Sequence, residues 1–296
     1  MTAAEPIVRP LEMKIEPKTR FDQQRLLDAL PQLANFDPTF GFSVDDESGE
    51  IILQGQSELH LDLKTYHLIG ELGIAVQVGP PQICYRETIT RPATCDYTHS
   101  PNNTFARVEL RVAPRSRDAG NVFESEFRDA PEIAAYASGV EKGVRSILAN
   151  GVLIGFPLAD VCVTWTNGSF DTVRSNPVAF EIAARFALKA AFDKAQIVLL
   201  EPIMKVEIET PVDFLSRVLT DIDGRRGKII SQEMRGEGTL IEAHIPLATM
   251  FGYIRGLHSL TKGVGTYAMS YSHYDFVPRN IANGPDQFPP AMGMRA

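Results

Sequence analysis

A short basic run at residues 224–228 (GRRGK) is the part of the sequence that comes nearest to a nucleotide-binding loop. A phosphate-binding P-loop needs four residues between its first glycine and a Gly-Lys-Ser/Thr ending, because the backbone wraps the phosphates and the hydroxyl reaches Mg²⁺. The run has neither that spacing nor the hydroxyl residue. No Gly-x-Ser-x-Gly turn presents a nucleophilic serine, and the six histidines form no cluster with metal-ligand spacing. The sequence therefore predicts no catalytic residue, cofactor site or metal site in this chain.

The cations of this run, Arg225, Arg226 and Lys228, have two possible roles. They directly follow a predicted helix that ends at Asp223-Gly224, where positive charge offsets the negative end of the helix dipole. They also have the chemistry that contacts nucleic-acid phosphates. Their spacing alone favours the helix-end role.

Two long polar stretches, residues 95–105 (CDYTHSPNNTF) and 167–177 (NGSFDTVRSNP), are predicted to be loops. Loops carry binding residues more often than cores do, although most loops only connect elements. Pro101 and Asn102-Asn103 predict a stiff polar turn within the first stretch. Both stretches are candidate binding loops.

The charge balance argues against a partner held by bulk attraction to phosphates, because 29 Lys+Arg against 37 Asp+Glu give a net charge of −8. The excess lies almost wholly in residues 1–87, with 7 Lys+Arg and 14 Asp+Glu, whereas residues 88–200 hold 12 of each. Three cysteines without a pairing pattern, no signal-peptide start and no apolar run of 18 residues predict a cytoplasmic protein with no membrane partner.

The hydrophobic pattern predicts the element order βαββαβ twice, first over residues 11–79 and again from residue 204 to about 278. In the first repeat, Thr19 and Ser57 are predicted helix caps. Each repeat fits a ferredoxin-like split βαβ sandwich. The predicted elements of the first are strands 11–15, 40–44, 50–54 and 75–78 and helices 20–35 and 57–72, the latter with Leu59, Leu63, Leu68 and Leu72 facing inward.

The second repeat is predicted to have strands at 204–209, 228–234, 239–245 and 265–271. Thr210-Pro211 is predicted to cap its first helix, and its second helix to run through Phe251, Ile254, Leu257 and Leu260. Between the repeats, strands at 107–113, 122–127 and 160–166 and helices at 131–150 and 178–195 predict a separate α+β domain. The predicted boundaries are 1–86, 87–200 and 201–282, with a Pro- and Gly-rich disordered tail at 283–296.

Several motifs resemble translation elongation factor G. EPKT (16–19), ESGEIILQG (47–55), SELHLD (57–62) and YRETIT (85–90) are similar to its third domain. The similarity to its fourth and fifth domains lies in GVLIGFP (151–157), LEPIMKVEIETP (200–211), DIDGRRGKI (221–229) and the run at 246–278. The resemblance runs from residue 11 to residue 278 in the family's order.

This resemblance implies the C-terminal half of a translational GTPase, with two ferredoxin-like sandwiches flanking a ribosomal-protein-S5-like α+β domain. It implies a chain that is not itself an enzyme, because GTP and Mg²⁺ would bind an N-terminal domain outside it. The implied partners are the ribosome, through ribosomal RNA and the tRNA and mRNA of the decoding region, and the GTPase and barrel domains of the same protein. The implied protein is a monomer.

The resemblance also implies which residues face RNA. The family's usual glycine-rich stretch is absent from the first loop, and in the second loop Asp171 stands where a histidine is common and Arg174 where an aspartate is usual. Ribosomal RNA contacts are implied for Arg225, Arg226 and Lys228. The implied RNA- or tRNA-facing residues are His99, Ser100, Pro101, Asn102 and Asn103 in the first loop and Ser169, Asp171, Arg174, Ser175 and Asn176 in the second.

Three functions remain open at this point. The first is tRNA and mRNA translocation or ribosome recycling. The second is ribosome protection against a tetracycline-type drug, which the non-glycine first loop suggests. The third is a stand-alone ribosome-binding scaffold without a GTPase domain.

Overall fold

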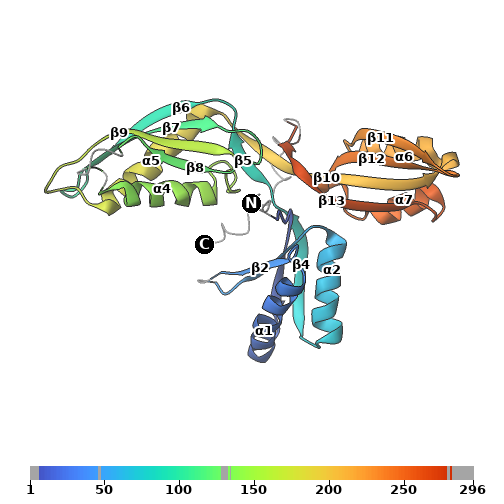
Figure 1. Ribbon diagram of the computed structural model, residues 1–296. Coiled ribbons are helices and arrows are strands. Elements are labelled where there is room, and N and C mark those ends of the chain that lie inside the picture. Colours follow the sequence, from blue (N-terminus) through green and yellow to red (C-terminus); the bar gives the residue numbers. More distant parts are fainter. Residues whose placement is uncertain (1–6, 46–47, 128–132, 134, 279–280, 282–296) are drawn as a thin grey trace, which may run out of the picture. The chain divides into compact units, whose positions relative to one another are not determined.

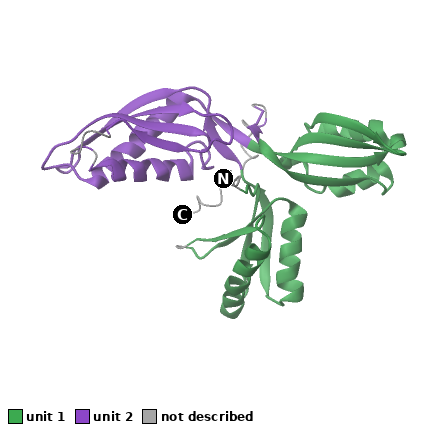
Figure 2. Cartoon of the chain, viewed as in Figure 1, with its two compact units in different colours: residues 1–84, 201–273 green, residues 85–200, 274–296 purple. Residues whose placement is uncertain are grey.

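The computed structural model describes residues 7–45, 48–127, 133, 135–278 and 281. The chain divides into two compact units, which we call unit 1 (Met1–Cys84 with Glu201–His273) and unit 2 (Tyr85–Leu200 with Tyr274–Ala296) (Figure 2). Among the described residues, no helix has both the length and the apolar composition needed to cross a membrane. The predicted tail at 283–296 lies outside the described residues, and the division into three domains stays a prediction.

The first sheet of unit 1 has the strand order β2-β3-β1-β4 (Figure 1). This is the ferredoxin-like arrangement that the βαββαβ pattern predicts. The predicted caps are confirmed: the Thr19 hydroxyl accepts from the Asp22 amide at 3.0 Å, and the Ser57 hydroxyl accepts from the His60 amide at 3.1 Å. The elements are β1 (Leu11–Pro17), α1 (Arg20–Phe36), β2 (Gly41–Val44), β3 (Ile51–Gly55), α2 (Glu58–Tyr66), the π-helical turn η1 (His67–Glu71) and β4 (Val76–Ile83).

The predicted inner face of α2 is wrong for most of its leucines. Leu61 and Leu68 are fully buried, whereas Leu59 and Leu63 are 64% and 59% exposed. Leucines occupy two faces of this helix, and their periodicity alone cannot say which face meets the sheet. The helix also widens into the π turn η1, which shifts the phase of the residues that follow.

The second sheet of unit 1 has the same order, β11-β12-β10-β13, so the predicted repeat is confirmed. Thr210 caps no helix: the turn η2 begins at Val212 instead, and no side chain caps it. In the second helix, Tyr253 and Leu257 are buried while Ile254 is 40% exposed, so only part of the predicted face is right. The elements are β10 (Ile197–Pro211), η2 (Val212–Phe214), α6 (Leu215–Gly224), β11 (Lys228–Arg235), β12 (Gly238–Pro246), η3 (Leu247–Thr249), α7 (Tyr253–Thr261) and β13 (Thr266–Phe276).

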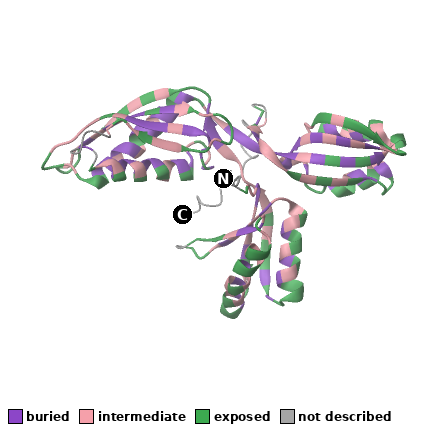
Figure 3. Ribbon diagram, viewed as in Figure 1, coloured by how far each residue is buried: buried purple, intermediate pink, exposed green. Residues whose placement is uncertain are grey.

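Unit 2 is built on a sheet of order β6-β7-β9-β8, in which β8 and β9 run parallel. Two helices pack on one face of this sheet (Figure 1), and the core between the layers consists of buried residues (purple in Figure 3). The predicted loop at 95–105 is partly wrong, because its first half belongs to β6. The elements are β5 (Arg86–Ile89), β6 (Ala93–His99), β7 (Ala106–Pro114), β8 (Val122–Ser125), α4 (Ala137–Asn150), β9 (Val161–Ser169) and α5 (Pro177–Ala195).

The helices α4 and α5 of unit 2 meet at two glycines of α4, where there is no room for a side chain. A Cβ atom on Gly139 would lie 2.2 Å from the Pro177 carbonyl oxygen, and one on Gly143 would lie 2.5 Å from the Glu181 carbonyl oxygen. The facing side of α5 is rich in buried alanine. Small residues on both helices therefore set the spacing of the layer that carries the loops described next.

Candidate nucleic-acid interface

The first candidate loop, residues 100–105, closes the hairpin between β6 and β7, whose last pair is His99 with Ala106. The Pro101 carbonyl accepts from the Thr104 amide at 2.9 Å, and Asn102 and Asn103 have φ of 48° and 60°. Two successive left-handed residues make a type I′ turn, which asparagine tolerates better than other non-glycine residues. The loop therefore closes tightly without a glycine.

The second candidate loop, residues 170–176, is organised by the Asp171 carboxylate. Its Oδ1 accepts from the backbone amides of Val173 and Arg174, both at 3.0 Å. Its Oδ2 accepts from Nε and Nη2 of the Arg174 guanidinium at 3.0 and 2.7 Å. The hydrogen bond from Arg174 is the main reason that the pKa of Asp171 is lowered to about 2. Asp171 and Arg174, the two positions at which the sequence departs from the expected pattern, are thus partners.

The two loops are fastened to each other. The Phe105 amide donates to the Arg174 carbonyl at 3.1 Å, and the Ser175 hydroxyl donates to the Phe105 carbonyl at 2.6 Å. The Arg174 guanidinium lies 5.5 Å from the centre of the Phe105 ring. Together they form one polar end of unit 2, away from β5 (Figure 1). We call residues 100–105 and 170–176 the tip loops.

Several of the predicted RNA-contact residues stabilise the structure of this end of unit 2. Asn176 caps α5, since its side chain accepts from the Ala179 amide at 2.8 Å. Ser175 joins the loops, and the Asp171 and Arg174 side chains neutralise each other. Ser169 is half-buried at the end of β9, and His99 is half-buried at the end of β6.

The groups that remain open to a ligand lie at the two turns. Ser100, Pro101, Asn102 and Asn103 are exposed, and the two asparagine side chains have no hydrogen-bond partner in the described part of the chain. Val173, which lies within the predicted loop at 167–177 but was not named as a contact residue, is 87% exposed. Its position between Asp171 and Arg174 could have indicated its exposure, because the pairing of these two side chains closes the loop and leaves Val173 at its turn.

The basic run at residues 224–228 is largely occupied within unit 1. The Arg226 guanidinium donates to both oxygens of the Glu201 carboxylate, at 2.5 and 2.9 Å, and that side chain is 3% exposed. At the end of α6, Arg225 pairs with Asp221 at 2.8 Å and also donates to the Thr249 carbonyl of η3. These contacts favour the helix-end and internal roles over phosphate contacts for both arginines.

Lys228 differs from the two arginines. It is exposed at the start of the edge strand β11, and within the described ranges its ammonium has no hydrogen-bond or ion-pair partner. It is the member of the basic run that is free to meet a phosphate.

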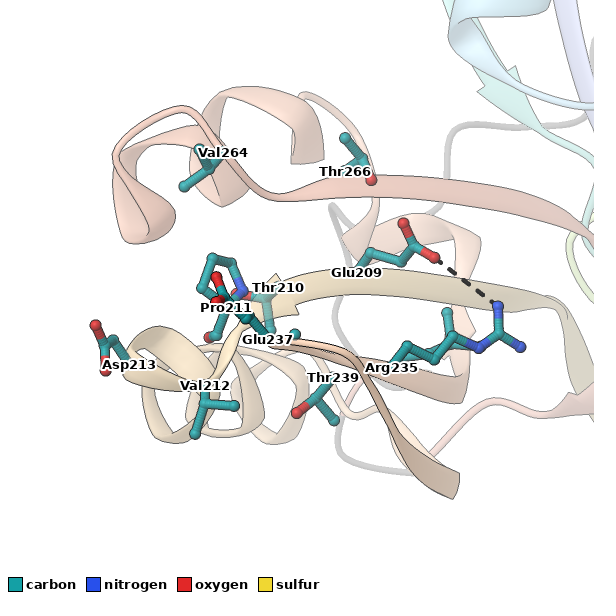
Figure 4. Close-up of a pocket in the computed structure, with 12 residues that line it drawn as sticks. Glu209, Thr210, Pro211, Val212, Asp213, Arg235, Glu237, Thr239, Val264 and Thr266 are labelled. Carbon is teal, nitrogen blue, oxygen red and sulfur yellow. Dashed lines mark hydrogen bonds and ion pairs between the residues drawn. The ribbon is translucent and has the colours of Figure 1, made fainter.

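A groove of about 600 Å³ lies at one end of the second sheet of unit 1 (Figure 4). Its lining carries the carboxylates of Glu209, Asp213 and Glu237 but one guanidinium, that of Arg235, 3.9 Å from Glu209. This balance repels phosphate, so the groove is no candidate for RNA. The part of the chain that the structure describes contains no group of three or more His, Cys, Asp or Glu side chains suited to a metal ion.

Comparisons with known proteins match nearly the whole chain. Residues 5–80 match the family described as Elongation Factor G, domain III, residues 81–196 match Elongation factor G, domain IV, and residues 198–284 match Elongation factor G C-terminus. These three matches follow one another in the order that the sequence motifs indicate, but the assignment of YRETIT (85–90) to the third domain is wrong, because that motif lies within the domain IV match.

Individual relatives agree. Elongation factor G of Rhodopseudomonas palustris (strain BisB18) is 43% identical over 286 residues, which cover 95% of this chain and 41% of the relative. That of Paracoccus denitrificans (strain Pd 1222) is 41% identical and covers 96% of this chain and 40% of the relative. A crystal structure from Thermus thermophilus has a TM-score of 0.68 at 33% identity, covering 94% of this chain and 42% of that chain.

The chain thus spans about two fifths of the length of the relatives that it matches. Through its third, fourth and C-terminal domains, this chain belongs to the elongation factor G family.

Proposed function

We propose that this chain is the ribosome-engaging part of a translational GTPase of the elongation factor G type, and that its tip loops contact RNA in the decoding region. The observation that supports the proposal most strongly is the unbroken succession of three elongation factor G domain matches over residues 5–284. The tip loops add a physical argument, since they present free amide side chains on a turn that internal hydrogen bonds hold in one shape.

The charge of the tip region shapes how RNA would be recognised. Residues 88–200 are neutral overall, with 12 Lys+Arg and 12 Asp+Glu, and Asp171 neutralises Arg174. Attraction to the phosphate backbone therefore supplies little of the affinity. Recognition by shape and by hydrogen bonds from Asn102 and Asn103 suits structured RNA better. Of the predicted ribosomal RNA contacts in unit 1, we retain Lys228.

The GTPase activity, with its GTP and Mg²⁺, would belong to other domains of a full-length factor, which also supply this chain's neighbours. The relatives named above are all elongation factor G, and this favours translocation or recycling over ribosome protection against a drug. No observation favours a stand-alone scaffold.

The proposal is tested with a full-length factor that carries this chain as its C-terminal part. We expect it to bind 70S ribosomes and to drive GTP-dependent movement of tRNA and mRNA or, with a recycling factor, separation of the subunits. Factor that binds ribosomes normally but does neither would refute the proposal. Drug tolerance conferred on a sensitive host, without translocation or subunit separation, would establish the ribosome-protection alternative instead.

A further inference from the structure

Two motifs that the tip loops do not explain, YRETIT at 85–90 and GVLIGFP at 151–157, meet inside unit 2. The carboxylate of Glu87, in β5, is fully buried and accepts from five consecutive backbone amides of the facing loop. Oε2 accepts from Val152 and Leu153 at 2.6 and 2.9 Å. Oε1 accepts from Ile154, Gly155 and Phe156 at 2.8, 3.0 and 3.2 Å. We call residues 151–156 the carboxylate nest.

The backbone of the nest is shaped around this carboxylate. Gly151 has φ 70° and ψ −179°, a conformation that is essentially restricted to glycine. A Cβ atom there would lie 2.2 Å from the Phe156 carbonyl oxygen and 2.9 Å from Glu87 Oε1. Gly155 has φ 100°. Two glycines thus allow five amides to point at one carboxyl group.

The chain enters, leaves and returns to unit 2 at this same place. Glu87 is bound through its backbone too, donating to the Pro157 carbonyl at 2.9 Å and accepting from the Ala159 amide at 2.8 Å. β5 pairs with the first residues of β10, from Ile197↔Ile89 to Leu200↔Arg86. The segment that returns to unit 2 also contacts β10, since the Val277 amide donates to the Leu199 carbonyl at 3.0 Å. Phe156 of the nest packs with the side chains of Leu199 and Val277.

A buried carboxylate is a poor source of stability, because its desolvation offsets much of what its hydrogen bonds contribute. The carboxylate has a larger effect on the conformation of the loop. It accepts from all five backbone amides only when the whole loop adopts a single conformation. A movement at one end of a domain is transmitted to its other end only when the structure between them stays rigid. The carboxylate nest lies at the end of unit 2 away from the tip loops (Figure 1), where such rigidity is needed.

We propose that Glu87 is a positioning residue: it locks the base of unit 2, so that movement imposed on the chain at this base reaches the tip loops. This inference rests on the proposed function. It assigns to Glu87 the coupling of GTP hydrolysis to tRNA movement, with no contact between Glu87 and RNA or nucleotide.

The test compares Glu87→Gln with wild type and with Glu126→Gln in a full-length factor that carries this chain. The introduced glutamine would keep the shape of the side chain but turn an NH₂ group toward amide donors. Glu126 is a matched control, because its ion pair with Arg111 is exposed in the same unit. The measurements are hydrogen exchange of the nest amides, ribosome binding, GTP hydrolysis on the ribosome and the rate of a single round of translocation.

We expect Glu87→Gln to exchange the amides of Val152–Phe156 at least tenfold faster and to slow translocation about tenfold, with ribosome binding and GTP hydrolysis within twofold of wild type. Translocation within twofold of wild type, despite faster exchange, would overturn the inference. So would an equal loss of GTP hydrolysis and translocation. If Glu87→Gln does not fold, Glu87→Asp is measured by the same criteria, and failure of both to fold would leave Glu87 a folding residue and overturn the positioning role. Wild type and Glu126→Gln that both bind ribosomes but neither translocate nor separate the subunits would refute the proposed function itself.

Discussion

The pairing of Arg226 with Glu201 allows the two roles considered for the basic run to be separated by measurement. Arg226→Ala removes both donors from a carboxylate whose side chain is 3% exposed. Breaking a buried ion pair in this way costs about 3–5 kcal/mol. The Arg226 side chain is 28% exposed, so water reaches the vacated space, and we expect a loss near the lower limit, about 3 kcal/mol of unfolding free energy.

The assay is urea denaturation of the 296-residue chain, with unfolding monitored by a probe placed in unit 1. It is carried out for Arg226→Ala, Glu201→Gln and the double variant. Residues in direct contact give non-additive effects, so the double variant should be at least about 1.5 kcal/mol more stable than the sum of the single losses predicts. Lys228→Ala is the control, since it removes a cation two positions away that has no partner among the described residues. It should change stability by less than about 0.5 kcal/mol.

The phosphate-contact role predicts the reverse pattern. If Arg226 met ribosomal RNA, Arg226→Ala would leave the unfolding free energy within about 0.5 kcal/mol of wild type. It would instead reduce the slope of log K against log salt for ribosome binding by about 0.9. That combination of results would refute the internal role derived from the Glu201 pairing.

Three further predictions concern the tip-bearing unit and the free lysine. Gly143→Ala should destabilise unit 2 by about 2 kcal/mol in urea denaturation, because its Cβ would lie 2.5 Å from the Glu181 carbonyl oxygen and push the helices apart; unchanged stability would show that the helices adjust freely. Because the pKa of Asp171 is lowered to about 2, its hydrogen bonds persist at pH 4 and are lost as the pH falls through about 2. The Val173 amide shift in NMR should titrate there, and a midpoint near 4 would contradict the pairing. Lys228→Ala should reduce the salt slope of ribosome binding by about one unit, and an unchanged slope would remove Lys228 from the interface.

The order of elements could be predicted because each is amphipathic with a clear period and clear ends. Thr19 and Ser57 cap their helices as the sequence indicates. The faces of α2 and α7 could not be predicted, since apolar residues occupy more than one face of each helix. β6 was missed because its exposed edge position admits polar residues such as Asp96 and Thr98, which give no apolar alternation.

The candidate site was predictable where its interactions are local. The turn at Asn102-Asn103 follows from residue types alone. The Arg226 partner lies 25 positions away, and the amides that bind Glu87 lie 65 to 69 positions away. Such pairings depend on how the sheets bring distant segments together, and no local spacing in the sequence encodes them.

Directed cleavage of RNA tests the central claim most directly. An iron chelate that generates hydroxyl radicals is attached to a cysteine at Asn103 or Val173, the exposed positions of the two tip loops, in a full-length factor bound to ribosomes. Phe36, 88% exposed in unit 1, serves as the control position, and the unsubstituted factor controls for the native cysteines, three of which lie in this chain. We predict cleavage of small-subunit ribosomal RNA around the decoding region from both tip positions and none there from Phe36. Ribosome-bound factor that cleaves no decoding-region RNA from either tip position would contradict the account.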